Sequence, residues 1–156
     1  MGILKLDGVD GVAHNPKNTY TALANGTITK GQVVILETDG SESPDPDEYG
    51  YAGQVVLACD ANSSPLACGV ALTSATDGQR VTIQTGGLID GVNGTSPTSA
   101  EAIALLDRVS ASTSGQIRIY DSDSSTTEVL GVCIDAYSSG DTDGKFMMYD
   151  KGWFTN

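Results

Sequence analysis

Hydrophobic and polar positions alternate over short distances along the chain, and this pattern predicts brief strands separated by turns. Ile117 and Ile119 alternate with polar neighbours, as do Val81 and Ile83, which is the period of two expected for a strand with one solvated face. The strands predicted from such runs are 33–36, 54–58, 68–72, 80–84, 116–120, 129–134 and 145–149. The protein is therefore predicted to be all-β.

One segment, TSPTSAEAIALLDRV at 95–109, has a helical pattern instead. Thr98 and Glu101 have the spacing of a capping box, and apolar residues follow at helical spacing. The same letters also fit a strand that begins near Leu105. We therefore expect at most one short helix in the protein.

Residues 1–27 are predicted to form an extended N-terminal arm, because their apolar residues follow neither period over a useful length. These apolar residues are Ile3, Leu4, Leu6, Val9 and Val12, with Tyr20 further along. A segment of this composition either frays or docks on a neighbouring subunit. The remaining residues, 28–156, are predicted to form a single β domain.

The chain contains an internal repeat. When GQVVLACDANSSPLACGVAL at 53–72 is aligned without gaps over GQIRIYDSDSSTTEVLGVCI at 115–134, five of the twenty positions are identical. Further on, the letters TDG recur at 76–78 and 142–144, and each copy leads into a predicted strand. Two units are too few for a solenoid, so the halves, about 28–90 and 91–156, are predicted to share one compact barrel or sandwich core.

Charge and hydropathy narrow the classes of partner. Twenty acidic residues against eight basic ones give a formal net charge of −12, which repels nucleic acid and anionic lipid. The acidity serves either solubility or a specific basic partner. No apolar run is long enough for a membrane span, and the opening residues lack a signal-peptide pattern, so we expect synthesis in a cytoplasm without membrane attachment.

The candidate metal ligands and the cysteines do not have the spacing of a known metal site. Cys59, Cys68 and Cys133 form no Cys-x-x-Cys pair, so we predict buried thiols and no zinc site, with a Cys59–Cys68 disulfide as the alternative. The acidic stretch 39–53 lacks the ligand spacing of a calcium loop and is predicted to be a solvated surface loop. Neither a metal nor a cofactor is expected.

The sequence also contains no recognisable arrangement of catalytic residues. The one histidine, His14, lies in the predicted arm, where no triad can be assembled around it. The acidic pairs at 121 and 123 and at 141 and 143 lie in turn-rich stretches where aspartate serves backbone geometry. The sequence therefore predicts a protein that is not an enzyme.

The order of three stretches carries a family resemblance: GQVVIL at 31–36, GVALTSATDGQRVTIQTGGLIDGV at 69–92, and ALLDRVSASTSGQIRIYDSDSSTTEVLGVCIDAYSSGDTDGKFMMYD at 104–150. Together these resemble the bacteriophage head decoration proteins, also called capsid cement proteins, over roughly residues 28–150. The resemblance implies a β-rich subunit that forms homotrimers on the outer capsid surface and binds the major capsid protein. The acidic loop at 39–53 and the Trp153-Phe154 tail depart from the family pattern.

The leading hypothesis is therefore a structural virion protein that stabilises contacts between major capsid protein subunits. Its predicted contacts are the apolar residues of the arm, including Tyr20, and the Trp153 and Phe154 side chains, which instead pack into their own core in the alternative interpretation. The alternative function is a β-rich phage tail, fibre or surface adhesion module that binds a host glycan or protein.

Overall fold

The protein is all-β in its computed structural model, which describes residues 19–36, 55–59, 67–89, 102–122, 128–136, 138 and 144–149. The strands are β1 (Thr19–Ala24), β2 (Val33–Leu36), β3 (Val55–Ala58), β4 (Ala67–Ala71), β5 (Arg80–Gln84), β6 (Gly87–Ile89), β7 (Arg108–Ala111), β8 (Ile117–Ile119), β9 (Val129–Asp135) and β10 (Lys145–Met148). One short 3-10 turn, η5 (Thr113–Gly115), joins β7 to β8. The strands predicted from the sequence pattern are confirmed, with ends that differ by one or two residues.

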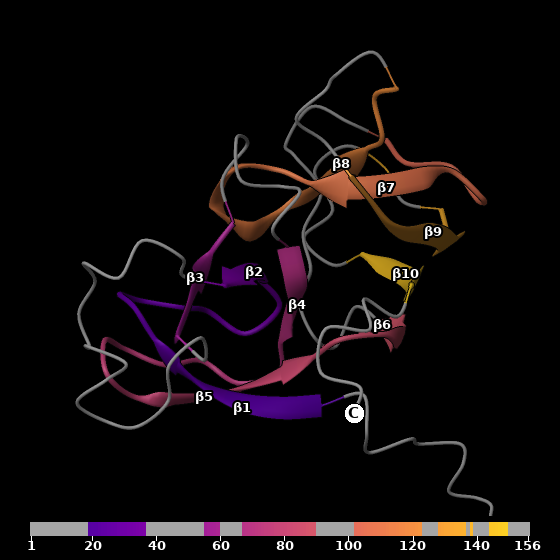
Figure 1. Ribbon diagram of the computed structural model, residues 1–156. Coiled ribbons are helices and arrows are strands. Elements are labelled where there is room, and N and C mark those ends of the chain that lie inside the picture. The colour runs from indigo at the N-terminus through magenta and orange to yellow at the C-terminus, as the bar shows by residue number, and fades with distance from the viewer. Residues whose placement is uncertain are drawn as a thin grey trace, which may run out of the picture.

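The first five strands form a closed barrel in the order β1-β3-β2-β4-β5. Neighbouring strands are antiparallel, except that β1 and β3 run parallel and thereby close the barrel. The barrel occupies the indigo and magenta part of Figure 1, and the orange and yellow strands lie to one side of it.

The last five strands form a second sheet in the order β6-β10-β9-β7-β8. This is the strand order of the barrel, β1-β5-β4-β2-β3, with each strand replaced by its counterpart later in the chain. A pairing equivalent to that of β1 with β3 does not occur among the described residues of the second sheet, which therefore stays open. The two halves are thus related, as the sequence repeat predicts.

The register confirms the relationship between the halves in detail. In both halves the register of the central strand pair shifts by one residue at the same place, between Val34 and Ile35 and between Val109 and Ser110. The paired residues are Val33↔Val70, Val34↔Gly69 and Ile35↔Ala67 in the barrel, and Arg108↔Val132, Val109↔Gly131 and Ser110↔Val129 in the second sheet. A shared β-bulge of this kind is a specific structural feature, and it indicates a duplicated unit.

The gapless sequence alignment is correct for β4 and β9 but wrong by one residue for β3 and β8. Val56 pairs with Leu36 in the barrel, and Ile117 pairs with Ala111 at the equivalent place in the second sheet. Val56 and Ile117 are therefore equivalent, and both are fully buried. A slip of one residue moves every side chain to the other face of a strand, so the loops between strands absorb the difference in length.

Two clusters of buried side chains make up the core. The first fills the barrel and includes Val34, Val56, Val81 and Ile83, with Tyr20 and Leu36 packed against it. The second lies between the outside of the barrel and the inside of the second sheet. It joins barrel residues such as Val33 and Val70 to second-sheet residues such as Ile117, Leu130 and Phe146. The halves therefore share one core, as predicted.

A polar junction supplements this core. The N–H of Gly115 in η5 donates to the carbonyl oxygen of Cys59 over 2.8 Å, and Gln32 Nε2 donates to the carbonyl oxygen of Ser114 over 2.9 Å. Gly115 has a φ of 74°, and a Cβ there would lie 2.6 Å from the Cβ of Gln32. Glycine is thus needed both for the backbone conformation and for the close approach of the two halves.

Three boundaries differ from the predicted ones. Thr19–Ala24, assigned to the arm, form β1 of the barrel, whereas residues 1–18 lie outside the described residues. The first strand of the second sheet is β6, Gly87–Ile89, a few residues before the approximate boundary at 91. Residues 105 and 106 form a turn and β7 begins at Arg108, three residues later than the predicted strand start, and the described residues 102–109 contain no helix. The rest of the stretch with the helical pattern, 95–101, lies outside the described residues.

Candidate functional site

Most of the predicted contact residues lie outside the described residues: Ile3, Leu4, Leu6, Val9, Val12, Trp153 and Phe154. Tyr20 is described, and it lies in β1 with its ring packed against the barrel core. Its hydroxyl is 3.2 Å from Cys68 Sγ. Burial, followed by the neighbouring Cys68, raises the pKa of Tyr20 far above its ordinary value, so the phenol stays neutral. Contacts within the same chain thus hold the Tyr20 ring in place.

The three cysteines are free thiols and all are buried, which confirms the predicted buried thiols over the disulfide alternative. Burial raises the pKa of the Cys133 thiol, so this group is held in its unreactive protonated form. Cys68 Sγ donates a weak hydrogen bond of 3.5 Å to the carbonyl oxygen of Val34. These thiols serve packing.

Reactive arrangements do not occur among the described residues. No group of three or more His, Cys, Asp or Glu side chains is placed there to hold a metal ion, and no described helix is long and apolar enough to cross a membrane. A small depression between the 27–29 and 74–76 segments of the barrel is lined by hydroxyl, amide and aliphatic side chains, none of them ionisable. Asp121 is exposed, and Asp123, Asp141 and Asp143 lie outside the described residues.

One four-residue turn occurs three times, at 29–32, 76–79 and 104–107, and each copy leads into a strand. In every copy the fourth N–H donates to the first carbonyl oxygen, over 3.1, 2.9 and 3.1 Å respectively. The fourth side chain, from Gln32, Gln79 or Asp107, accepts a hydrogen bond from the first N–H over 2.7, 2.9 and 2.9 Å. These are type II turns, which require a positive φ at the third position.

The third copy of this turn departs from the other two. Gly31 and Gly78 occupy the third position with φ values of 92° and 74°, whereas the same position in the third copy holds Leu106 with a φ of 74°. Leu106 is 70% exposed and its neighbour Leu105 is 58% exposed. A leucine in the left-handed region costs about 1–2 kcal/mol, and an exposed side chain recovers little of this through packing.

The outer face of the second sheet is the second unusual feature. A row of residues paired across four strands runs Leu88, Met147, Val132 and Arg108. The equivalent barrel residues of the last two are Val70 and Val33, which are fully buried against the second sheet. In the second sheet, Leu88 and Met147 are 48% and 41% exposed, Arg108 is exposed and Val132 is half-buried. The face that is covered in the first unit is thus open at these positions in the second.

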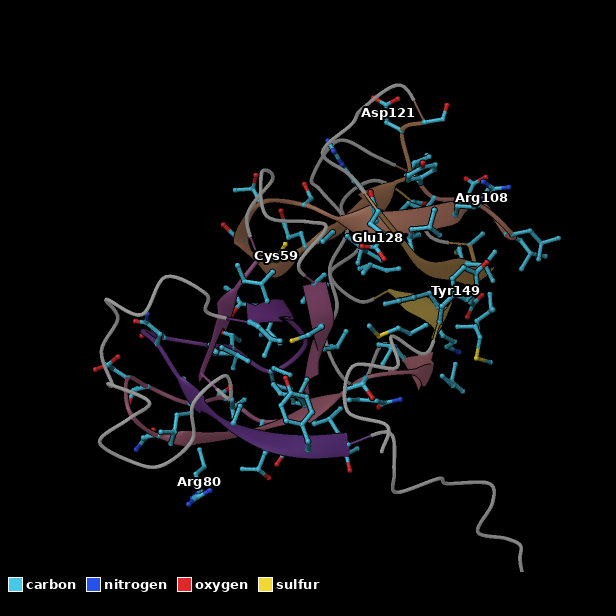
Figure 2. The ribbon with its side chains drawn as sticks, viewed as in Figure 1. Cys59, Arg80, Arg108, Asp121, Glu128 and Tyr149 are labelled. Atoms are coloured by element: carbon cyan, nitrogen blue, oxygen red, sulfur yellow. The ribbon has the colours of Figure 1, made fainter. Side chains whose placement is uncertain are left out.

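Basic and polar side chains replace apolar ones on this face, which is exposed at Arg108 and covered at Ser110. Arg108 and Ser110 stand where the barrel has Val33 and Ile35, and Arg118 lies directly opposite Ser110 on β8. The Nε atom of Arg118 and the Oγ atom of Ser110 are buried and have no hydrogen-bond partner. Figure 2 shows Arg108 and Tyr149 on the side of the second sheet away from the barrel, and Arg80 at the opposite end of the molecule.

We call this surface the outer face of the second sheet, and define it by Leu88, Arg108, Arg118, Val132 and Met147. Sequence reasoning missed it, because exposure depends on which sheet face the other half covers. The signal that was available is the exchange of Val33 for Arg108 between the two units. The described residues thus form a duplicated β fold in which one sheet face exposes apolar and basic side chains.

The family of this protein follows from comparison of its sequence. The model of the phage cement protein family matches residues 12–148. The chain therefore belongs to the phage cement proteins, and it is a structural protein of the phage head, as the resemblance implied. No curated protein is significantly similar to it in sequence.

A solved structure has a similar fold. It is the N base of the head fiber gp8.5 in bacteriophage phi29, with a TM-score of 0.56 and 13% sequence identity, over 84% of this chain and 92% of that one. At this identity the likeness supports the fold.

Proposed function

We propose that this protein is a capsid cement protein that binds the outer surface of the phage head and bridges neighbouring major capsid protein subunits. The observation that carries the proposal is the family match, which spans both structural units from residue 12 to residue 148. The duplicated fold supports it, since a rigid body with a shared core can hold two contact points at a fixed separation.

The mechanism is one of mass action. A ligand that binds only the expanded lattice stabilises that lattice by an amount set by its concentration and affinity, and many copies act together. No covalent chemistry is required. The protein is made in the host cytoplasm, binds neither nucleic acid nor membrane, and acts as a homotrimer at the capsid surface. Its net charge of −12 supports the exclusion of both nucleic acid and membrane as partners.

The experiment mixes the purified protein with expanded heads from a phage that lacks its gene, and sediments the heads. We expect co-sedimentation to a fixed number of copies per head, together with a higher temperature of head disruption. Unexpanded heads serve as the control and should bind less. Failure to sediment with expanded heads would refute the proposal. The mass of the free protein in solution separately tests the homotrimer.

A second function is favoured by one observation, the fold likeness to a phage head fiber base. In this alternative the chain is a β-rich tail, fibre or surface adhesion module that recognises a host glycan or protein. Binding to whole host cells, with no binding to expanded heads, would favour this alternative over the cement function.

A further inference from the structure

Exposed apolar side chains are confined to one half of the described structure. The large hydrophobic residues with substantial exposure are Leu88, Leu105, Leu106, Ile119, Met147 and Tyr149, all of them in or beside the second sheet. The described residues of the barrel unit contribute none. Because the two units share one strand order, this asymmetry reflects a difference in what covers them.

The internal duplication indicates what the difference is. In the first unit, the face carrying Val33 and Val70 is covered by the second sheet. In the second unit, no third sheet covers the equivalent face among the described residues, and the row from Arg108 and Val132 to Met147 and Leu88 is partly or largely exposed. A face adapted only to solvent would have no need of an exposed methionine and leucine side by side.

The composition of the open face fits a protein partner. Arginine, methionine and aromatic residues are enriched in the centres of protein interfaces, whereas aspartate, glutamate and lysine are depleted there. Leu88, Met147, Arg108 and Arg118 match this composition, and Tyr149 follows Met147 on the same strand end. On a protein of net charge −12, two arginines in one apolar patch call for an acidic partner surface.

The strained turn gives independent support. Leu106 keeps a left-handed backbone where the sister turns have Gly31 and Gly78, so the leucine side chain is retained despite its conformational cost. The N–H of Leu106 donates to the carbonyl oxygen of Cys133 on β9, which places the turn beside the same sheet. Two exposed leucines there extend the apolar surface next to Arg108.

We propose that the outer face of the second sheet, with the Leu105-Leu106 turn at its margin, is the surface that docks on the capsid shell. Its occupant is a shell surface with an apolar centre flanked by carboxylates. This inference rests on the proposed function and adds to it the contact face and the chemistry of the partner. Met147 and Leu88 fill the centre of the contact, while Arg108 and Arg118 pair with the carboxylates.

The test uses the full chain with the double substitution Arg108→Glu and Met147→Asp, and measures its binding to expanded heads that lack the protein. Both residues are exposed, so the melting temperature should stay close to that of the wild type. We expect binding to weaken by about tenfold or more. The matched control is Arg80→Glu, an exposed arginine on barrel strand β5, which makes the same change of charge as Arg108→Glu alone and should bind as the wild type does.

Each outcome is decisive. If the wild type binds heads and the double variant binds equally well, the docking face is wrong and the cement function stands. If the wild type does not bind heads, both proposals fail. If the double variant changes the mass of the free protein and not its intrinsic binding to heads, the face is a contact between copies of this chain, which overturns the inference. Equal weakening by Arg80→Glu would show that only net charge matters.

Discussion

Gly69 and Gly131 occupy the same position in the two units, and in each unit the backbone of the neighbouring strand fills the space that a side chain would need. A Cβ on Gly69 would collide with the carbonyl oxygen of Gln84, and one on Gly131 would collide with the carbonyl oxygen of Met147. This explains why both copies of the sequence repeat have glycine at the first position of the Gly-Val pair. The constraint comes from the backbone, which cannot rotate away as a side chain can.

The first prediction concerns these two glycines. Gly131→Ala should destabilise the protein by more than about 2 kcal/mol, since the strands β9 and β10 must separate to admit the methyl group. Gly69→Ala should cost a similar amount. The control is Gly26→Ala, where nothing lies within 4 Å and only the positive φ of 78° opposes alanine. It should cost about 1 kcal/mol. Urea unfolding measures all three, and equal losses would contradict the prediction.

The second prediction concerns the third copy of the turn. Leu106→Gly should raise the free energy of unfolding by about 1 kcal/mol, because it removes the strain of a left-handed leucine. The same change should weaken binding to expanded heads if the turn contacts the shell. Leu105→Gly is the matched control, since residue 105 has no positive φ and gains nothing from glycine. Equal stability changes for the two variants would contradict the strain argument.

Sequence pattern was sufficient for strands with a strong period and insufficient for the short ones. β5 was predicted with both ends correct because Val81 and Ile83 alternate cleanly with polar residues. β6, only three residues long, offers too few positions for a period to emerge. β7 was obscured by the alanines and leucines before it, which have high helix propensity, and tertiary pairing with β8 and β9 overrides that propensity.

The candidate site was less accessible to sequence reasoning than the fold. Repeat detection found the related halves, but it could not say which face of each sheet the other half covers. Arg108 and Val33 look unremarkable in separate strands, and their equivalence emerges only from the matching registers of β7 with β9 and β2 with β4. The exposure of a side chain depends on how the two halves pack together. A docking face can therefore be identified only once that packing is known.

The third prediction compares two neighbours on β10. Phe146 is fully buried between the barrel and the second sheet, whereas Met147 points to the open face. Phe146→Ala should destabilise the protein by about 3–5 kcal/mol, through lost burial and the cavity it leaves. Met147→Ala should cost less than about 1 kcal/mol and weaken head binding instead. Calorimetry and sedimentation separate the two effects, and comparable losses of stability would show that Met147 is also a core residue.

The fourth prediction concerns the thiols. Cys59, Cys68 and Cys133 are free and buried, so a thiol reagent such as Ellman's reagent should react slowly with the native protein. In guanidinium chloride all three should react at once. A lower final count would indicate a disulfide, in disagreement with the structure. Fast reaction of the native protein would show that the core opens readily.

The last prediction concerns Tyr20 and alkaline pH. Burial raises its pKa in the folded protein, so the folded state keeps the phenol neutral while the unfolded state releases its proton above pH ~10. A group whose folded pKa is raised leaves stability intact below the unfolded pKa and lowers it as pH rises beyond that value. Between pH 8 and pH 11 the wild type should therefore lose about 1.4 kcal/mol more stability than Tyr20→Phe.

The comparison with Tyr20→Phe removes the Tyr20 hydroxyl and keeps its ring against the barrel core. At pH 8 the variant should be less stable by about 1 kcal/mol, since it lacks the hydrogen bond between the Tyr20 hydroxyl and Cys68 Sγ. The two stability curves should then converge as pH rises and cross just below pH ~11, because only the wild type has a buried phenol whose proton the unfolded state releases. Urea unfolding at fixed ionic strength measures both curves. Parallel curves up to pH 11 would mean that the Tyr20 hydroxyl reaches solvent in the folded protein.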